Sequence, residues 1–231
     1  MNLNSKKNHQ PTLDISQIVH DLKNPLTTII ASVDFLKNNK VPEKNRSQFY
    51  DMIENESKNI LNFINDILEI SKLENESQAR SDSQCNIVLV TSKVLKDLKP
   101  MSSQKNIKVK VNIPEDLNIN IPEIRIKQIL SNLISNSIKY NKKNGKINID
   151  SYQKNNLLYI EVEDTGIGIS DKEQQKIFDK FYRCTEAKKL NIEGTGLGLS
   201  IVSNIINAYS GNIKISSAIN RGSKFIISLP I

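Results

Sequence analysis

LLYIEVEDTGIGI, residues 157–169, places an acid and two glycines directly after a predicted β-strand. Residues 157–163 are predicted to form a β-strand, because they follow the Lys154-Asn155-Asn156 turn of an expected hairpin. Asp164 follows at the strand end, with Gly166 and Gly168 behind it. A buried carboxylate there can accept a hydrogen bond from an exocyclic amine such as adenine N6, and glycine lets the backbone approach a flat base closely. The alternative is a plain turn with two glycines, but such a turn would not require an acid directly before them.

The segments around this stretch predict an α+β sandwich, with helices over one face of a mixed sheet. Residues 146–153 should form a hairpin with it, and a further strand is expected at 107–113. A last pair of strands is expected at 213–217 and 224–229. Helical spacing predicts four helices, at 89–101, 124–139, 171–178 and 197–209.

Two longer helical runs precede this sandwich. Apolar residues recur at three- and four-residue steps from Ile15 to Val33, and after a break at 38–42 they recur again from Phe49 to Leu73. Two amphipathic helices joined by a short loop make an antiparallel hairpin. Because two helices alone cannot enclose a core, we expect a second copy of the chain to complete a dimeric four-helix bundle.

These patterns divide the chain into four parts. They are a flexible lead at 1–13, a helical hairpin at 14–76, a polar linker at 77–84 and an α+β domain at 85–231.

Composition excludes several classes of protein. No apolar run approaches the ~20 residues of a membrane-spanning helix, and the N-terminus lacks the apolar core of a secretion signal, so we expect a cytoplasmic protein with no direct membrane span. Cys85 and Cys184 lack the C-x-x-C spacing of a zinc or redox site. The net charge of +7 comes without a long basic stretch interleaved with aromatic residues, so nucleic acid is not the expected partner.

His20 is a candidate nucleophile on the first helix. It lies roughly 140° from the centre of the apolar stripe, so it should point away from the seam of the hairpin. Asp21 could accept the second imidazole proton, which makes the ring a better nucleophile. Asn24, one turn later on the same face, could orient a water molecule. Pro25 costs about 3 kcal/mol inside a helix and bends it, or else Asn24 caps a new helix there; the unbroken stripe favours one kinked helix.

Two further segments suit a phosphate-binding site. Asn132 and Asn136 share a helix face, and their amide oxygens could ligate Mg²⁺, although such a pair alone is weak evidence in an asparagine-rich chain. GTGLGL at 194–199 precedes a predicted helix, and glycine-rich backbone before a helix N-terminus cradles phosphates. Arg183 could neutralise charge on a transferred phosphoryl group, and the polar residues 182–197 could form a lid.

Five segments in this order resemble the H, N, G1, F and G2 boxes of bacterial sensor histidine kinases. They are IVHDLKNPL at 18–26, NLISNSIKY at 132–140, DTGIGI at 164–169, FDKFYR at 178–183 and GTGLGL at 194–199. The resemblance extends from about residue 14 to residue 231. It implies a dimerisation and histidine-phosphotransfer hairpin followed by a catalytic domain of the ATP-binding fold that is also found in type II topoisomerases, mismatch-repair ATPases and a heat-shock chaperone.

The resemblance implies an activity and partners. His20 would be autophosphorylated from MgATP with Asp21 as its acid/base partner, and the phosphoryl group would pass to an aspartate in the receiver domain of a response regulator. Asn24 would position water for dephosphorylating that regulator. The hairpin would form a homodimer, and a sensor domain or a partner protein would supply the signal, since only about a dozen residues precede the hairpin.

The resemblance also implies roles in the pocket. Asn132 and Asn136 would serve Mg²⁺ and the phosphates, Asp164 would bind adenine, and Arg183 would face the γ-phosphate. The residues expected to shape the pocket and its lid are Lys139, Tyr140, Gly166, Gly168, Gly194, Thr195, Gly196, Leu197 and Gly198.

The chain departs from the family pattern at two places. Residues 120–123, NIPE, stand where the family often has an acidic residue and a glycine, and Ser137 replaces a common alanine. Neither change removes a predicted ligand. Three alternatives stay open: a phosphatase-dominant protein, a non-catalytic nucleotide-sensing dimer, and an ATPase of the topoisomerase or chaperone type. The intact asparagines, acid and glycines favour the kinase, because a catalytically dead relative tends to lose them.

Overall fold

The structure, a computed structural model, describes residues 15–38, 40–75, 84–190, 192 and 194–231. The chain falls into two compact units, residues 1–65 and 66–231. The predicted lead at 1–13 and all but the last residue of the predicted linker at 77–84 lie outside the described residues. The four-part division of the chain therefore stays a prediction.

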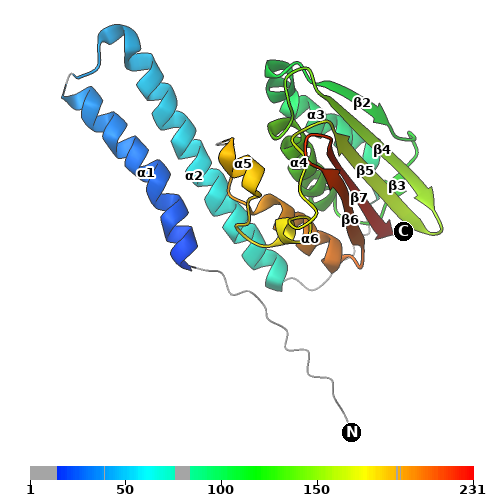
Figure 1. Cartoon of the computed structure of the whole chain (residues 1–231). Coiled ribbons are helices and arrows are strands. Elements are labelled where there is room, and N and C mark those ends of the chain that lie inside the picture. Colours follow the sequence, from blue (N-terminus) through cyan, green and yellow to red (C-terminus); the bar gives the residue numbers. More distant parts are fainter. Residues whose placement is uncertain (1–14, 39, 76–83, 191, 193) are drawn as a thin grey trace. The chain divides into compact units, whose positions relative to one another are not determined.

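The N-terminal part of the chain is a helical hairpin. Helix α1, Ile15–Lys37, and helix α2, Arg46–Asn75, are joined through the short 3₁₀-helix η1, Glu43–Asn45 (Figure 1). Pro25 lies inside α1, so this helix is continuous as expected from the unbroken apolar stripe.

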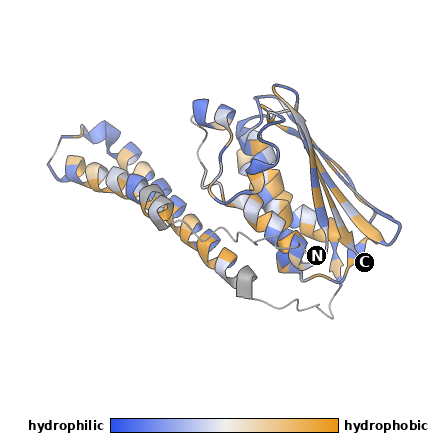
Figure 2. Cartoon of the chain, turned by 60° about the horizontal axis from the view of Figure 1, so that its bottom comes forward, coloured by the Kyte–Doolittle hydropathy of each residue, from blue (hydrophilic) through white to orange (hydrophobic). Residues whose placement is uncertain are grey.

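Packing between the two helices is visible near the loop. The rings of Phe35 and Phe49 meet edge to face with centroids 6.2 Å apart, and the Ser32 hydroxyl donates to the Met52 sulfur at 3.4 Å. Apolar residues follow both helices beyond this contact (Figure 2). Several stay exposed, among them Ile30 at 66% and Leu61 at 58%, so a single hairpin does not bury its apolar residues.

The second unit contains a mixed five-stranded sheet in the order β2-β4-β5-β7-β6. Its strands are β2, Lys108–Asn112; β4, Lys146–Lys154; β5, Leu157–Asp164; β6, Asn212–Ala218; and β7, Gly222–Pro230. Only β2 and β4 pair in parallel in the sheet, and the other neighbours are antiparallel. A separate two-stranded ladder joins β1, Cys85–Asn86, to β3, Asn118–Ile119, and these strands are too short for an alternating pattern to predict them.

Three helices cover one face of this sheet (Figure 1). They are α3, Ile87–Gln104; α4, Glu123–Lys139; and α6, Gly198–Ala208. Alternate residues of the central strands face them and are fully buried, including Ile149, Ile160 and Ile227. The buried side chains of α4 that complete the core are Ile126, Ile129, Leu130, Leu133, Ile134 and Ile138. The predicted fold class, a helical hairpin followed by an α+β two-layer sandwich, is confirmed.

Two local predictions need correction. Residues 171–178 were predicted to be helical, but they form turns that end in the 3₁₀-helix η2, Lys176–Phe178. The Gln174 side chain donates to the carbonyls of Ile169 and Ser217, and main-chain bonds of the i to i+3 type replace the α-helical pattern. The polar segment 182–197 contains a five-residue helix, α5, Thr185–Lys189, that its sequence did not predict.

The C-terminal end of α4 is held by a side chain from the end of α3. Lys105 donates from its ammonium to the carbonyls of Ile138 at 3.1 Å, Lys139 at 2.5 Å and Asn141 at 3.3 Å. The last carbonyls of a helix lack partners within the helix and carry partial negative charge, so a cation stabilises them. Partial burial lowers the pKa of Lys105.

We expect Lys105→Met to destabilise the second unit by about 1–3 kcal/mol, because it leaves helix-end carbonyls without their donor. The measurement is the midpoint of thermal unfolding of the whole chain. Lys110→Met is the matched control, since Lys110 is exposed on β2. Equal midpoints for the two variants would contradict the capping role.

Candidate functional site

A cavity in the second unit brings together predicted site residues from four separate segments. Helix α4, the connection after β5, the segment around Arg183 and the glycines before α6 all contribute to it. The predicted residues that line it are Asn132, Asn136, Lys139, Tyr140, Asp164, Gly168, Arg183, Gly194, Thr195, Gly196 and Gly198.

Asp164 is the buried acid of this cavity. It is the last residue of β5, and only 7% of its surface is exposed. The carboxylate accepts from the Gly166 amide at 2.8 Å and from the Ser223 amide, with the Ser137 hydroxyl at a long 3.5 Å. Burial is the largest influence and raises the pKa of Asp164 to about 6, against these hydrogen bonds, which lower it. A carboxylate has about four acceptor sites, so Asp164 keeps capacity to accept from a ligand amine.

Close backbone packing holds the loop that carries Asp164. Gly168 has φ of +70°, and a Cβ there would lie 1.9 Å from the Ala218 carbonyl oxygen. Gly222 has φ of +90°, and a Cβ there would lie 1.9 Å from the Asp164 carbonyl oxygen. Both positions therefore require glycine. The turn between β6 and β7 is thus pressed against the predicted base-binding loop.

The end of α4 is joined to the same loop. The Tyr140 carbonyl accepts from the Ile167 amide at 3.0 Å, and a Cβ on Gly166 would lie 2.4 Å from that carbonyl oxygen. Gly166 supports the loop in this way but does not itself line the cavity. Burial raises the pKa of the Tyr140 phenol, so it stays neutral and able to donate.

Asn132 presents its amide oxygen to the glycine segment. Its Nδ2 donates to the Gln128 carbonyl of its own helix at 3.0 Å, which orients the amide. A Cβ on Gly198 would lie 2.5 Å from Asn132 Oδ1, so glycine is needed where the N-terminus of α6 passes this oxygen. Asn136 lines the cavity one turn further along α4.

Two cationic side chains also line the cavity. A Cβ on Gly194 would lie 3.1 Å from the Lys139 ammonium and 3.3 Å from the Tyr140 hydroxyl, so the glycine segment runs past both groups. Arg183 donates from Nη2 to the Ile192 carbonyl. Its Nε is buried and has no hydrogen-bond partner among the described residues. A buried donor without a partner is unfavourable, and an anionic ligand would satisfy it.

The structure does not bring every predicted residue to the cavity. Leu197 is fully buried and belongs to the core. Asn24 is exposed on α1 in the first unit, where its carbonyl accepts from the Thr28 hydroxyl at 3.3 Å. The side chains of His20 and Asp21 lie outside the described residues, so their predicted roles stay predictions.

Several lining residues were not predicted as site residues. They include Ser137, Ile167, Ile169, Ile177, Tyr182, Cys184, Leu199, Ser223 and Phe225. Ser137 was visible as a departure from the family pattern, and Tyr182 and Cys184 flank Arg183 in the sequence. Alternation along β7 places Ser223 and Phe225 on the core face, but no local pattern says that this face meets Asp164.

The groups that line this cavity fit a nucleotide triphosphate with a divalent cation. Asp164 can accept from an amine, the glycine segment leads into the N-terminus of α6, and Lys139 and Arg183 supply positive charge beside it. The amide oxygens of Asn132 and Asn136 are hard ligands of the kind Mg²⁺ accepts, and Mg²⁺ in phosphate sites keeps most of its waters.

Two family models match the chain. The model described as the His Kinase A (phospho-acceptor) domain matches residues 15–76. The model described as the histidine kinase-, DNA gyrase B-, and HSP90-like ATPase matches residues 121–231.

Histidine kinases are among the proteins that this chain resembles. Sensor histidine kinase WalK of Bacillus subtilis is 32% identical over 220 residues, which are 94% of this chain and 36% of WalK. The structure of histidine kinase AdeS of Acinetobacter baumannii matches with a TM-score of 0.74 at 25% identity, covering 91% of this chain and 97% of that chain. Histidine kinase ThkA, in complex with response regulator protein TrrA, matches with a TM-score of 0.74 at 25% identity, covering 94% of this chain and 60% of that chain.

None of the helices in the described part of the chain is long and apolar enough to cross a membrane.

The order of the two matched domains is the order of the hairpin and the sandwich in this chain. The chain therefore belongs to the two-component sensor histidine kinases, whose kinase core it contains.

Proposed function

We propose that this chain is an ATP-dependent protein-histidine kinase that autophosphorylates His20 and passes the phosphoryl group to an aspartate of a response regulator. The observation that carries the proposal is one cavity lined by the buried Asp164, by Asn132 and Asn136, and by the glycine segment before α6. Asp164 suits a purine at one end of the cavity, and the asparagines and the glycine segment suit a polyphosphate at the other.

Asp164 binds the base in this mechanism. An ionised carboxylate accepts a hydrogen bond from the exocyclic amine, while the apolar side chains of Ile169, Ile177 and Phe225 line the same cavity and can contact the ring. The amides of Gly166 and Ser223 hold the carboxylate in place. Guanine carries an oxygen where adenine carries the amine, so an ionised acceptor favours adenine.

Phosphoryl transfer needs little covalent chemistry from the protein beyond the nucleophile. A ring nitrogen of neutral His20 attacks the γ-phosphorus, the bond to the β–γ bridging oxygen breaks, and ADP leaves with that electron pair. Asp21 accepts the proton that the ring then loses. Lys139 and Arg183 offset negative charge on the phosphates, and Mg²⁺, when bound, supplies further charge neutralisation.

The product on His20 is a phosphoramidate, a high-energy linkage that suits a relay to a second acceptor. The likeness to ThkA, which was solved with a response regulator protein, supports a receiver domain as the partner. The chain spans 36% of WalK, so an input domain elsewhere in a longer protein, or a separate partner, would supply the signal. The proposed reaction consumes ATP, which the cytoplasm supplies, so we propose that it takes place there.

Exposed apolar residues on the hairpin support a homodimer. Val19, Leu26 and Ile30 on α1 recur at seven- and four-residue steps and are 58%, 46% and 66% exposed. On α2, Leu61 and Ile64 are 58% and 41% exposed. Repeats of this kind pack in helical bundles, so a second copy would cover both stripes.

Incubation with γ-labelled ATP should label the wild-type chain and leave His20→Ala unlabelled, since the imidazole is the acceptor. The chain has two histidines, so His9→Ala is the matched control and should be labelled like the wild type. The label should be released by acid and retained in base, as expected for a phosphoramidate. Equal labelling of the His20→Ala variant would refute the assignment.

Nucleotide affinity should depend on pH through Asp164. Its pKa is raised to about 6 in the free protein, and the amine requires the ionised form. Below this pKa a proton must leave before the base can bind, so ADP affinity should rise about tenfold per pH unit up to about pH 6 and level off above pH 7. Titration of a fluorescent ADP analogue measures this.

Asp164→Asn should weaken ADP binding at least about tenfold at pH 8 and remove the dependence on pH near 6, because the amide cannot ionise. Asp116→Asn is the matched control, since Asp116 is an exposed acid that does not line the cavity. An unchanged pH profile in Asp164→Asn would exclude the proposed contact with the base.

A second activity, dephosphorylation of the regulator, is favoured by the position of Asn24. This amide is exposed on α1 one turn beyond His20, where it can orient a water molecule. Asn24→Ala should reduce dephosphorylation of a phosphorylated regulator about a hundredfold while His20 labelling changes less than threefold. Parallel loss of both activities would assign Asn24 to folding of the helix and not to the phosphatase step.

A further inference from the structure

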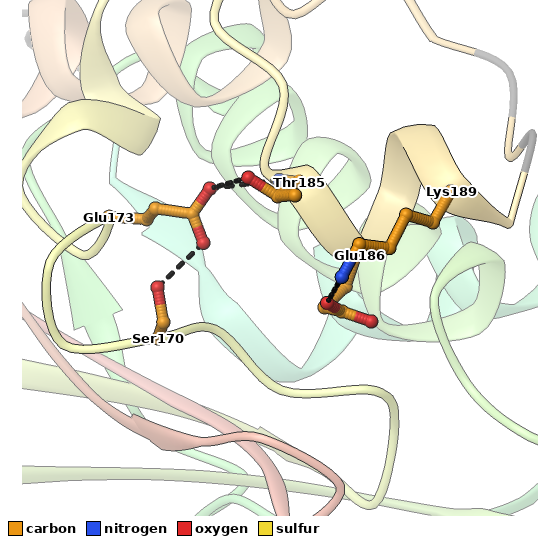
Figure 3. A network of polar contacts seen from close by, with 5 residues as sticks. All are labelled: Ser170, Glu173, Thr185, Glu186 and Lys189. Atoms are coloured by element: carbon orange, nitrogen blue, oxygen red, sulfur yellow. Dashed lines mark hydrogen bonds and ion pairs between the residues drawn. The ribbon is translucent and has the colours of Figure 1, made fainter.

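Glu173 accepts four hydrogen bonds from Ser170, Tyr182 and Thr185, and Figure 3 shows Ser170 and Thr185 beside its carboxylate. The Ser170 hydroxyl donates to Oε2 at 2.6 Å, and the amide and hydroxyl of Thr185 both donate to Oε1 at 2.8 Å. The Tyr182 hydroxyl donates to Oε1 at 3.1 Å. One carboxylate thus ties the turn after β5 to the start of α5.

Tyr182 and Thr185 lie on either side of Arg183, one of the two cationic residues that line the cavity. Arg183 and Cys184 lie between Tyr182 and Thr185, and both line the cavity. Glu173 is not one of the lining residues. The carboxylate therefore holds both ends of a two-residue segment that faces the ligand, without facing the ligand itself.

The start of α5 depends on this carboxylate. The helix has five residues, and its N-cap residue, Cys184, makes no side-chain capping hydrogen bond among the described residues. Glu173, which lies outside the helix, caps it instead by accepting a hydrogen bond from the Thr185 amide. A negative charge at a helix N-terminus is also favourable. These hydrogen bonds lower the pKa of Glu173 to about 2, so the charge persists at physiological pH.

The segment is also pinned at its base. The Phe181 amide donates to the Gly196 carbonyl at 3.1 Å, and a Cβ on Gly196 would lie 2.6 Å from the Phe181 carbonyl carbon. The segment between them contains Arg183, whose Nη2 donates to the Ile192 carbonyl within the same loop. The contact between Phe181 and Gly196 fixes only the ends of this loop. The position of Arg183 within it therefore depends on other contacts, and four of these are the hydrogen bonds to Glu173.

We propose that Glu173 is a positioning residue for phosphoryl transfer: by holding Tyr182 and Thr185 it directs the guanidinium of Arg183 at the terminal phosphate. The proposal rests on the proposed kinase function for the reaction it serves. Glu173 acts through Arg183 and does not touch the nucleotide. Replacing Glu173 should therefore weaken binding of the terminal phosphate, as replacing Arg183 does, and should leave the other contacts to the nucleotide unchanged.

Binding measurements test this without any turnover. ADP lacks the terminal phosphate, so the wild type should bind a non-hydrolysable ATP analogue about tenfold more tightly than ADP if Arg183 faces that phosphate. Glu173→Gln should lose this preference while its ADP affinity changes less than about threefold. Glu186→Gln is the matched control: Glu186 lies on α5 in an ion pair with Lys189 at 2.7 Å (Figure 3) and should keep the preference.

A double-mutant cycle separates positioning from general stabilisation. Arg183→Ala should abolish the preference for the ATP analogue, and Glu173→Gln combined with Arg183→Ala should bind both nucleotides like Arg183→Ala alone. Additive losses in the double variant, or an unchanged preference in Glu173→Gln, would overturn the proposal. If thermal unfolding shows that Glu173→Gln does not fold, Thr185→Val removes one of the four bonds and should reduce the preference by about threefold.

The kinase assay then distinguishes the two proposals. Relative to the wild type, Glu173→Gln should lower the rate of His20 labelling at saturating ATP about tenfold or more, with little change in KM. If the wild type binds nucleotide but never labels His20, the kinase function fails while the binding cycle still decides the role of Glu173. If labelling occurs and the cycle is additive, only the role of Glu173 fails.

Discussion

The burial of the Asp164 carboxylate is the constraint on which the rest of the site depends. Removing a charge from water is unfavourable, and the raised pKa of Asp164 records that imbalance. Amides from the Gly166 loop and from β7 must therefore reach the carboxylate, which brings two turns together at van der Waals distance. That approach is open only to glycine at Gly168 and Gly222, two positions far apart in the sequence.

Helix α4 joins the part of the cavity around this acid to the part lined by Asn132 and Asn136. One face of the helix supplies the core over the sheet, and the other presents the asparagine amides. Its C-terminal carbonyls are held by Lys105, and its last turn bonds to the loop after β5 through Tyr140. The two ends of a bound nucleotide would thus be placed by a single rigid element. The cationic side of the cavity is supported differently, by a short loop that Glu173 ties to the turn after β5.

Much of the architecture was predictable because helices and strands have local periods. The antiparallel hairpin, the paired strands at 146–164 and the helices around Leu133 and Ile205 follow from alternation or from three- and four-residue spacing. The prediction of a helix at 171–178 was wrong because the side chains of Gln174 and Glu173 form hydrogen bonds with residues outside this segment. Those bonds outweigh a weak local preference for helix. Helix α5 was missed for the related reason that its N-terminal cap comes from Glu173, twelve residues upstream.

The chemically competent residues could be identified from the sequence alone: an imidazole off the apolar stripe, an acid at a strand end, paired amides and two glycine segments in a fixed order. How the residues of the second unit come together could not be predicted without the packed structure. The parallel pairing of β2 with β4, the turn between β6 and β7 that presses on the Asp164 loop, and the four bonds to Glu173 join residues far apart along the chain. Periodicity reports the environment of one face of one element, whereas contacts of this kind depend on how several elements pack together.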